Sequence, residues 1–295
     1  MRKEYMENYY SRIEIFVLAD DYAGMTKGFL AQHGVSYFIR LHRDQGEKTS
    51  ILFDTGYDGK AVLHNMKLLG LDINEVDYIV LSHNHYDHSN GLLYLLEKRT
   101  KKTAIPVIVG RGFFEKTIAL KPRMRILNPD WSRNQGESLG TWFIETSEKL
   151  EIMPGVSVPG IIKYDERLEF EKEAPEYYIV DGNGFKRDFL EHEIALVIES
   201  SRGLLVFTGC SHPGVASIVE KVVNLYGRKV YSVIGGMHLI NADELRIKRT
   251  IQKLRELGVA KVFAGHCTGL KAEKAFLEVY GDDFVRIHTA LQISI

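Results

Sequence analysis

The stretch from Tyr78 to Gly91 constrains this chain more than any other part of the sequence. Residues 78–81 are apolar and partly β-branched, which predicts a buried strand. Three histidines and an aspartate then lie within the six positions 83–88. Leaving several imidazoles and a carboxylate unpaired at the end of a buried strand is costly. A metal ion is the simplest partner, because neutral imidazole nitrogens and carboxylates suit zinc, iron or manganese.

The spacing of these residues suggests two pairs of metal ligands. His83 and His85 lie two positions apart at the end of a strand, so their side chains leave the chain on one side. Asp87 and His88 follow where the chain must turn toward a helix expected over residues 92–98. One pair can hold one metal and the next pair a second. The alternative is a polar loop whose histidines are simply hydrogen-bonded.

Composition excludes several other classes of protein. The chain has 295 residues, of which 45% are hydrophobic and 26% charged, as in soluble globular proteins. A net charge of −1 gives no basic field for nucleic acid. No apolar run reaches the roughly 18 residues that cross a membrane. Two cysteines and a charged N-terminus without a signal-peptide core predict a cytoplasmic protein; the oligomeric state is left open.

Periodicity predicts a single α+β domain over residues 1–295. Strands and interspersed helices occur in both halves, which predicts four layers in the order helix, sheet, sheet, helix. The expected strands span 13–18, 35–41, 49–53, 78–81, 105–109, 195–199, 204–208, 230–234, 261–264 and 284–288; the expected helices span 61–69, 92–98, 217–225, 243–257 and 272–280.

A looser segment, residues 111–175, is predicted to be an insertion near the substrate. Within it, aromatic residues such as Phe113 and Trp131 alternate with cations such as Lys116 and Arg133. They could form a half-exposed region with local packing. They could instead form a substrate wall, with rings for a planar group and cations for phosphate.

The histidine motif resembles that of the metallo-β-lactamase superfamily. Upstream, residues 51–56 (ILFDTG) look like the family's first motif, and residues 203–212 and 261–266 look like its later ligand-bearing strands. The resemblance implies an αββα metallo-β-lactamase-like sandwich. It also implies one or two divalent ions, with zinc expected and iron, manganese or magnesium as alternatives. It assigns catalytic roles to Asp54, as a support for the metal-binding histidines, and to Asp87.

Three further ligands are expected from the same resemblance. Cys210 stands where family members usually carry a bridging aspartate, although it could also be a small buried residue. Val156 stands where many members carry a third histidine for the first metal, so His212 is expected to supply that imidazole. His266 matches the family's final histidine, a ligand of the second metal.

Three residues are expected to contact the substrate. His238 follows two glycines that allow close backbone approach to a ligand, and it could contact substrate or shuttle protons. The alternative for His238 is a capped, hydrogen-bonded histidine. His33 receives a similar but weaker interpretation. Thr268, in the segment 265–269 (GHCTG), completes the set.

Four segments together resemble one branch of the superfamily more specifically. They are 33–36 (HGVS), 209–214 (GCSHPG), 235–239 (GGMHL) and 265–269 (GHCTG). The branch is that of the dihydropterin-methyl aminobenzene ribofuranosyl phosphate synthase of methanopterin biosynthesis. The resemblance implies a transferase that joins a dihydropterin-methyl diphosphate to an arylamine and releases diphosphate. A metal-dependent hydrolase of a phosphodiester or ester, and a non-catalytic binder of a phosphorylated metabolite, are the alternatives.

Overall fold

Two seven-stranded sheets form the centre of the protein. The computed structural model describes residues 10–25, 27–43, 46–101, 103–165, 177–182 and 184–295. The first sheet has the order β18-β1-β2-β3-β4-β5-β8. Its strands are β1 (Arg12–Ala19), β2 (Ser36–His42), β3 (Lys48–Phe53), β4 (Tyr78–Val80), β5 (Ile105–Gly110), β8 (Thr141–Thr146) and β18 (Gln292–Ser294).

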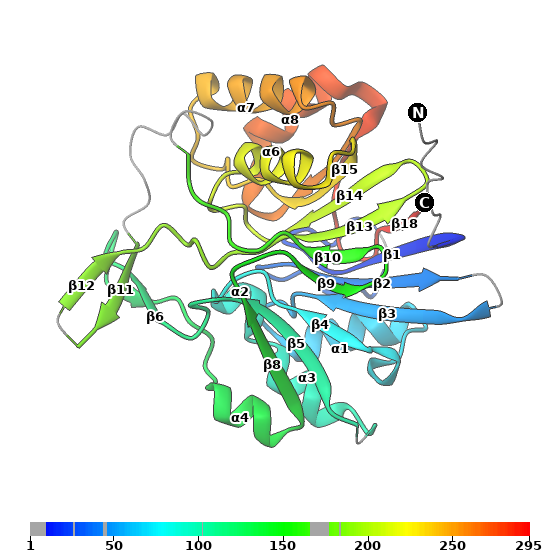
Figure 1. The fold of residues 1–295 in the computed structure, drawn as a ribbon, viewed down its shortest axis with the longest axis vertical. Coiled ribbons are helices and arrows are strands. Elements are labelled where there is room, and N and C mark those ends of the chain that lie inside the picture. The colour runs from blue at the N-terminus through cyan, green and yellow to red at the C-terminus, as the bar shows by residue number, and fades with distance from the viewer. Residues whose placement is uncertain (1–9, 26, 44–45, 102, 166–176, 183) are drawn as a thin grey trace.

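The second sheet has the order β17-β16-β15-β14-β13-β10-β9. Its strands are β9 (Leu150–Met153), β10 (Val156–Val158), β13 (Leu196–Ser200), β14 (Gly203–Thr208), β15 (Val230–Gly236), β16 (Lys261–Gly265) and β17 (Phe284–Arg286). A separate four-stranded sheet, β12-β11-β6-β7, projects from one side of the sandwich (Figure 1). It consists of β6 (Lys116–Ala119), β7 (Arg125–Ile126), β11 (Tyr177–Asp181) and β12 (Gly184–Arg187).

Helices cover the outer faces of both large sheets. The described helices are α1 (Gly59–Leu68), α2 (Tyr86–Ser89), α3 (Leu92–Lys98), α4 (Arg133–Ser138), α6 (Val215–Tyr226), α7 (Glu244–Glu256) and α8 (Leu270–Tyr280), with 3-10 turns η2 (Ile73–Glu75), η3 (His266–Thr268) and η4 (Gly281–Asp283). Helices α6, α7 and α8 lie over the second sheet, and α1 and α3 lie against the first (Figure 1). The predicted αββα four-layer architecture is therefore confirmed. Among the described residues, none of the helices combines the length and apolarity required to cross a membrane.

Apolar clusters fill the three spaces between the four layers. The central cluster joins the two sheets through Tyr37, Phe53 and Phe207, whose ring centroids lie 6.2–6.3 Å apart. The other two clusters hold the helices on the sheets. Burial of this much apolar surface fixes the sheets relative to each other, and so fixes the loops at their ends.

Local signals define the ends of the helices. The Asp58 side chain accepts a hydrogen bond from Lys60 N at 2.8 Å and caps α1. Asp243 caps α7 in the same way through Arg246 N. Gly227 ends α6 in the left-handed conformation, with φ of 62°, where glycine carries no steric penalty.

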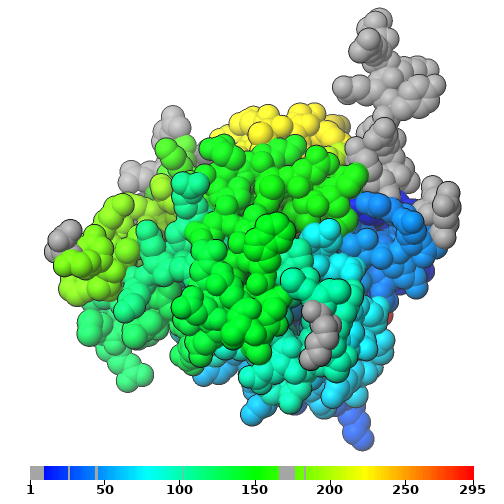
Figure 2. All heavy atoms as spheres, turned by 60° about the horizontal axis from the view of Figure 1, so that its bottom comes forward, coloured from blue at the N-terminus to red at the C-terminus, as the bar shows by residue number. Residues whose placement is uncertain are grey.

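The structure differs from the sequence-based expectation mainly after residue 111. Strand β8 was not predicted, although it pairs in parallel with β5 and completes one edge of the first sheet. Strand β18 was also missed, and the strand expected over 284–288 ends at Arg286. Of the predicted insertion 111–175, the part 166–175 lies outside the described residues. The described part supplies β6 and β7 to the small sheet, β8 to the first large sheet, and β9 and β10 to the second. In Figure 2 the green residues of this part cover the centre of the face shown.

Candidate metal centre

The predicted metal-binding residues meet at one end of the sandwich, just beyond the ends of parallel strands. Strands β3 and β4 run parallel in the first sheet, and β14, β15 and β16 run parallel in the second. Parallel strands bring their carboxyl ends to the same edge, where α/β proteins commonly place their sites. The loops after β4, β14 and β16 therefore bring residues 83–88, 210–212 and 266 together.

One group consists of Asp87, His88, Cys210 and His266, all buried, with ligand atoms within 4.8 Å of one another. The Nε2 atom of His88 lies 3.2 Å from Cys210 Sγ and 3.3 Å from His266 Nε2. The Asp87 Oδ2 atom lies 3.4 Å from both imidazole nitrogens. A tetrahedral ion with bonds of about 2.0–2.3 Å separates neighbouring ligand atoms by roughly 3.3–3.7 Å. These four side chains thus suit a divalent metal.

A second group consists of His83, His85 and His212, also buried and within the same 4.8 Å limit. Their ring centroids lie 4.6–4.9 Å apart. Within the described part of the chain, Nε2 of His83, Nε2 of His85 and both ring nitrogens of His212 lack a hydrogen-bond partner. Buried polar atoms normally have a hydrogen-bond partner, and a metal ion would serve as the missing partner of these nitrogens.

Asp54 is hydrogen-bonded to one histidine of the first group and, through Ser82, is linked to one histidine of the second. Its Oδ2 atom lies 2.8 Å from His88 Nδ1 and accepts a 2.7 Å hydrogen bond from Ser82 Oγ. Ser82 Oγ in turn lies 2.9 Å from His83 Nδ1. The carboxylate thereby orients one histidine of each group, directly for His88 and through Ser82 for His83. Such contacts fix the ring orientation and tautomer of metal-binding histidines.

The two groups differ in protonation when no metal is bound. Burial lowers the pKa of His83 well below its usual value and that of His85 to about 3, so both imidazoles are neutral. Burial also acts to lower the pKa of His88, but the carboxylates of Asp87 and Asp54 raise it to about 10. A metal at Nε2 of His88 must therefore displace a proton, as metal ligands generally require.

Two aspartates that follow β1, Asp20 and Asp21, hydrogen-bond to His266, a contact that was not predicted. The buried Asp20 Oδ2 accepts the backbone N–H of His266 at 3.0 Å. Asp21 binds the Nδ1 atom of His266 through its Oδ2 atom and lies 2.8 Å from His33 Nδ1 through its Oδ1 atom. Two carboxylates following a strand were the available signal, but only the fold shows that they face His266.

His33 reaches the site because of the glycine beside it. Gly34 has φ of 109°, and a Cβ atom there would lie 1.7 Å from the carbonyl oxygen of Asp87. Only glycine allows the two backbones to approach so closely. The His33 side chain is exposed, and its Nε2 atom lies 3.4 Å from Asp87 Oδ2.

The remaining predicted residues surround the two groups. The His238 ring lies 4.3 Å from that of His212, on a left-handed backbone with φ of 49°. The buried Thr268 hydroxyl accepts a 3.2 Å hydrogen bond from Met237 N. Substrate contact by His33, His238 and Thr268 stays a prediction. Val156 is fully buried in the apolar cluster between the sheets. The position where many family members carry a third histidine therefore does not contribute to either metal-binding group.

Both cysteines are free thiols. Cys210 contributes to the first group, whereas Cys267 Sγ bonds the carbonyl oxygen of Cys210 at 3.4 Å. Tyr177, which sequence reasoning did not identify, places its ring 5.5 Å from His85 and 5.6 Å from His212. It belongs to the projecting sheet, so no local pattern could have placed it there.

A cavity of about 620 Å³ opens beside the metal-binding residues. His33, Tyr57 and Tyr86 line it, and the two tyrosine rings meet edge-to-face at 5.7 Å. Its size suits a small-molecule ligand.

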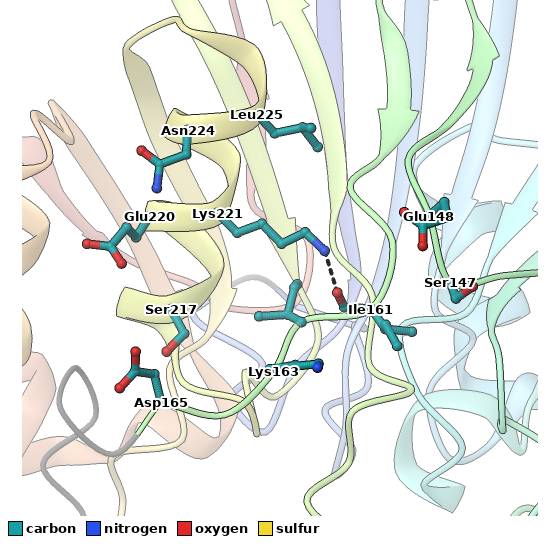
Figure 3. A pocket seen from close by; sticks show the side chains of 11 residues that line it. Ser147, Glu148, Ile161, Lys163, Asp165, Ser217, Glu220, Lys221, Asn224 and Leu225 are labelled. Carbon is teal, nitrogen blue, oxygen red and sulfur yellow. Dashed lines mark hydrogen bonds between the residues drawn. The ribbon is translucent and has the colours of Figure 1, made fainter.

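A hollow of similar size, about 640 Å³, lies between α6 and residues 147–165 (Figure 3). Lys221 donates to the carbonyl oxygen of Ile161 across this hollow, and Glu148, Asp165 and Glu220 surround it. The predicted site residues do not line it, and we assign it no function.

The fold and the two buried groups of candidate ligands are those of a class of metal-dependent enzymes. The chain belongs to the metallo-β-lactamase superfamily, whose family model matches residues 31–266. The predicted membership is thereby confirmed.

Two proteins of Methanocaldococcus jannaschii are similar in sequence. The chain is 40% identical to a 7,8-dihydropterin-6-methyl-4-(β-D-ribofuranosyl)-aminobenzene-5′-phosphate synthase, over 94% of each chain. It is 28% identical to an uncharacterized protein, over 88% of this chain and 91% of that one. The predicted resemblance to the synthase branch is therefore also confirmed.

Solved structures agree on the fold. A metal-dependent hydrolase of the β-lactamase superfamily superposes with a TM-score of 0.80 and 26% identity, covering 96% of this chain and 99% of that one. Zn²⁺-bound PqqB from Methylobacterium extorquens superposes with a TM-score of 0.55 and 13% identity, covering 95% and 99%.

Proposed function

We propose that this protein is a metal-dependent transferase that condenses a dihydropterin-methyl diphosphate with an aminobenzene ribofuranosyl phosphate and releases diphosphate. The 40% identity to the synthase over 94% of each chain carries this proposal. The chemistry of the site is compatible with it. The amine nitrogen forms a bond to the methylene carbon, the carbon–oxygen bond to diphosphate breaks with its electron pair leaving on oxygen, and the amine proton passes to solvent.

The metal-binding residues suit the departure of a polyanion. His83, His85 and His212 would hold one divalent ion, and Asp87, His88, Cys210 and His266 a second, with zinc the ion expected. Bound divalent ions neutralise charge on phosphate oxygens. The chain's own contribution is to fix the ligand side chains through Asp54 and to carry the tyrosine-lined cavity alongside them.

Two adjoining cavities support binding of ring-containing, phosphorylated substrates. The cavity at Tyr57 and Tyr86 shares residues 126, 128 and 129 with a neighbour of about 510 Å³. That neighbour is lined by Phe113, Phe114, Lys116, Trp131 and Arg133 among others. Rings offer faces to planar groups, and cations attract phosphate. This is the arrangement expected of the substrate wall predicted within 111–175.

A metal-dependent hydrolase of a phosphodiester or ester is the second candidate. It is favoured by the similarity to the superfamily hydrolase, at 26% identity and a TM-score of 0.80. Metal ions that lower the pKa of bound water from about 15.7 toward about 7 would serve that chemistry.

The test is an incubation of zinc-loaded protein with both synthase substrates. Mass spectrometry should detect the condensed product, with one diphosphate released per product. Chelated protein and the His85→Ala variant should form neither. Turnover of model phosphodiesters or esters without condensation would favour the hydrolase. Tight binding of the diphosphate substrate with no turnover of any kind would favour a non-catalytic binder.

A further inference from the structure

We propose that Glu193 is a positioning residue for both metal-binding groups, acting through the backbone of residues 210–212. This turn carries Cys210, which belongs to one group, and His212, which belongs to the other. Whatever holds the turn therefore sets the relative placement of two ligands. The inference rests on the metal-binding groups and not on which reaction the protein catalyses.

Both oxygens of the Glu193 side chain accept hydrogen bonds from the backbone of the turn. The Glu193 side chain is almost completely buried, with the residue 1% exposed. The Oε1 atom accepts the backbone N–H of Ser211 and the Oε2 atom that of His212, each at 2.7 Å. The carboxyl group therefore fixes two successive N–H groups of the turn. Without it, two buried N–H groups would lose their acceptors, and such groups are rarely left unpaired.

The hydrogen bonds to Glu193 stabilise a turn whose backbone conformation at Ser211 is unfavourable. Ser211 has φ of 67°, in the left-handed region that a residue with a Cβ atom avoids at a cost of about 1–2 kcal/mol. The Ser211 hydroxyl also donates to the carbonyl oxygen of Gly236 at 2.6 Å. The left-handed geometry aims two successive N–H groups at Glu193 while Cys210 and His212 point to different groups.

The residue after Glu193 is hydrogen-bonded to the loop that follows β4. The backbone N–H of the next residue, Ile194, donates to the carbonyl oxygen of Ser82 at 2.8 Å. Ser82 directly precedes His83 and bonds Asp54. The segment 193–194 therefore ties the loop after β4 to the turn after β14, across the two sheets. Glu193 does not belong to either group of candidate ligands, so it acts through the turn and not by touching the metal.

The experiment measures metal affinity at both sites in Glu193→Gln, with Glu191→Gln as the matched control. Glu191 is exposed two positions earlier. Glutamine keeps the volume but turns an NH₂ group toward one of the two N–H donors. We expect zinc affinity to fall by about 10–100-fold at both sites, as when a ligand's supporting residue is lost. In contrast, Glu191→Gln should bind zinc like the parent.

A second substitution separates positioning from general destabilisation. Adding Ser211→Gly to Glu193→Gln removes the left-handed penalty and should restore part of the zinc affinity. If folded Glu193→Gln protein binds zinc at both sites as the parent does, Glu193 does not position the ligands and the proposal is overturned.

Hydrogen exchange of the unsubstituted protein decides the matter even if Glu193→Gln does not fold. The amides of Ser211 and His212 should exchange slowly both in zinc-loaded and in chelated protein, because Glu193 holds them without metal. Fast exchange of these amides in folded, chelated protein would show that the metal and not Glu193 orders the turn, and would overturn the proposal.

Discussion

The Asp54 carboxylate lies 2.8 Å from Nδ1 of His88, and both side chains are completely buried. The two residues are 34 positions apart in the sequence. In the fold, the carboxyl group of Asp54 lies against one ring nitrogen of His88, a candidate metal ligand. The same carboxylate bonds Ser82, which lies against His83. The ring orientation of one histidine in each group thus depends on one residue of the loop after β3.

Asp54→Asn is expected to weaken zinc binding by about 10–100-fold, because an amide can no longer accept from both His88 and Ser82 as a carboxylate does. Isothermal titration with zinc measures the loss. The exposed Asp282→Asn serves as the control. Equal zinc affinity in both variants would mean that Asp54 does not support the ligands.

His212→Ala should lose about one equivalent of metal, because only His83 and His85 would remain in that group. Elemental analysis of purified protein gives the stoichiometry. His238→Ala is the matched comparison, since His238 lies beside His212 but outside both groups. Unchanged metal content in His212→Ala would remove His212 from the ligands.

Cys210→Ser and Cys267→Ser should behave differently although the two thiols are neighbours. Only the Cys210 sulfur lies among candidate ligands. A hydroxyl binds zinc less well than a thiolate, so Cys210→Ser should lose metal from the group containing His88 and keep the other equivalent. Elemental analysis again reports the change. Loss of the same amount from Cys267→Ser would contradict this assignment.

Chelation should lower the thermal stability of the protein. Removing the metal leaves the nitrogens of His83, His85 and His212 buried without partners. A ligand present at 1,000 times its dissociation constant stabilises a fold by about 4 kcal/mol. For a chain of this size we expect a fall in melting temperature on the order of 10 °C. Calorimetry with and without chelator tests this, and zinc added back should reverse it.

Tyr57→Leu should raise KM for the ring-bearing substrate about 10-fold and change kcat less. A ring–ring contact contributes about 0.5–1.5 kcal/mol beyond its buried area, and 1.4 kcal/mol is a factor of ten. Tyr231→Leu, at the opposite end of β15 from the site, should leave both constants unchanged. Steady-state kinetics of the condensation provides the measurement, and an unaltered KM would place the substrate elsewhere.

The amino-acid sequence determined the fold class and much of the candidate site. Alternating and buried apolar runs were enough to predict most strands, because strand periodicity is a local property. The spacing of His83, His85, Asp87 and His88 predicted two pairs, and these pairs lie in two separate clusters of side chains in the structure. Metal binding by either cluster stays a prediction. The resemblance of residues 261–266 to a ligand-bearing strand of the family likewise predicted that His266 lies near these residues.

Tertiary structure alone decided which distant residues complete each group. His88 and Cys210 are 122 positions apart and meet only because the ends of parallel strands from two sheets share one edge. Asp21, Tyr177 and Glu193 carry no local signal that specifies their partners, since single acidic and aromatic residues are ordinary in sequence. Their roles arise from contacts across the sandwich, which depend on packing between layers and not on the order of residues along one strand.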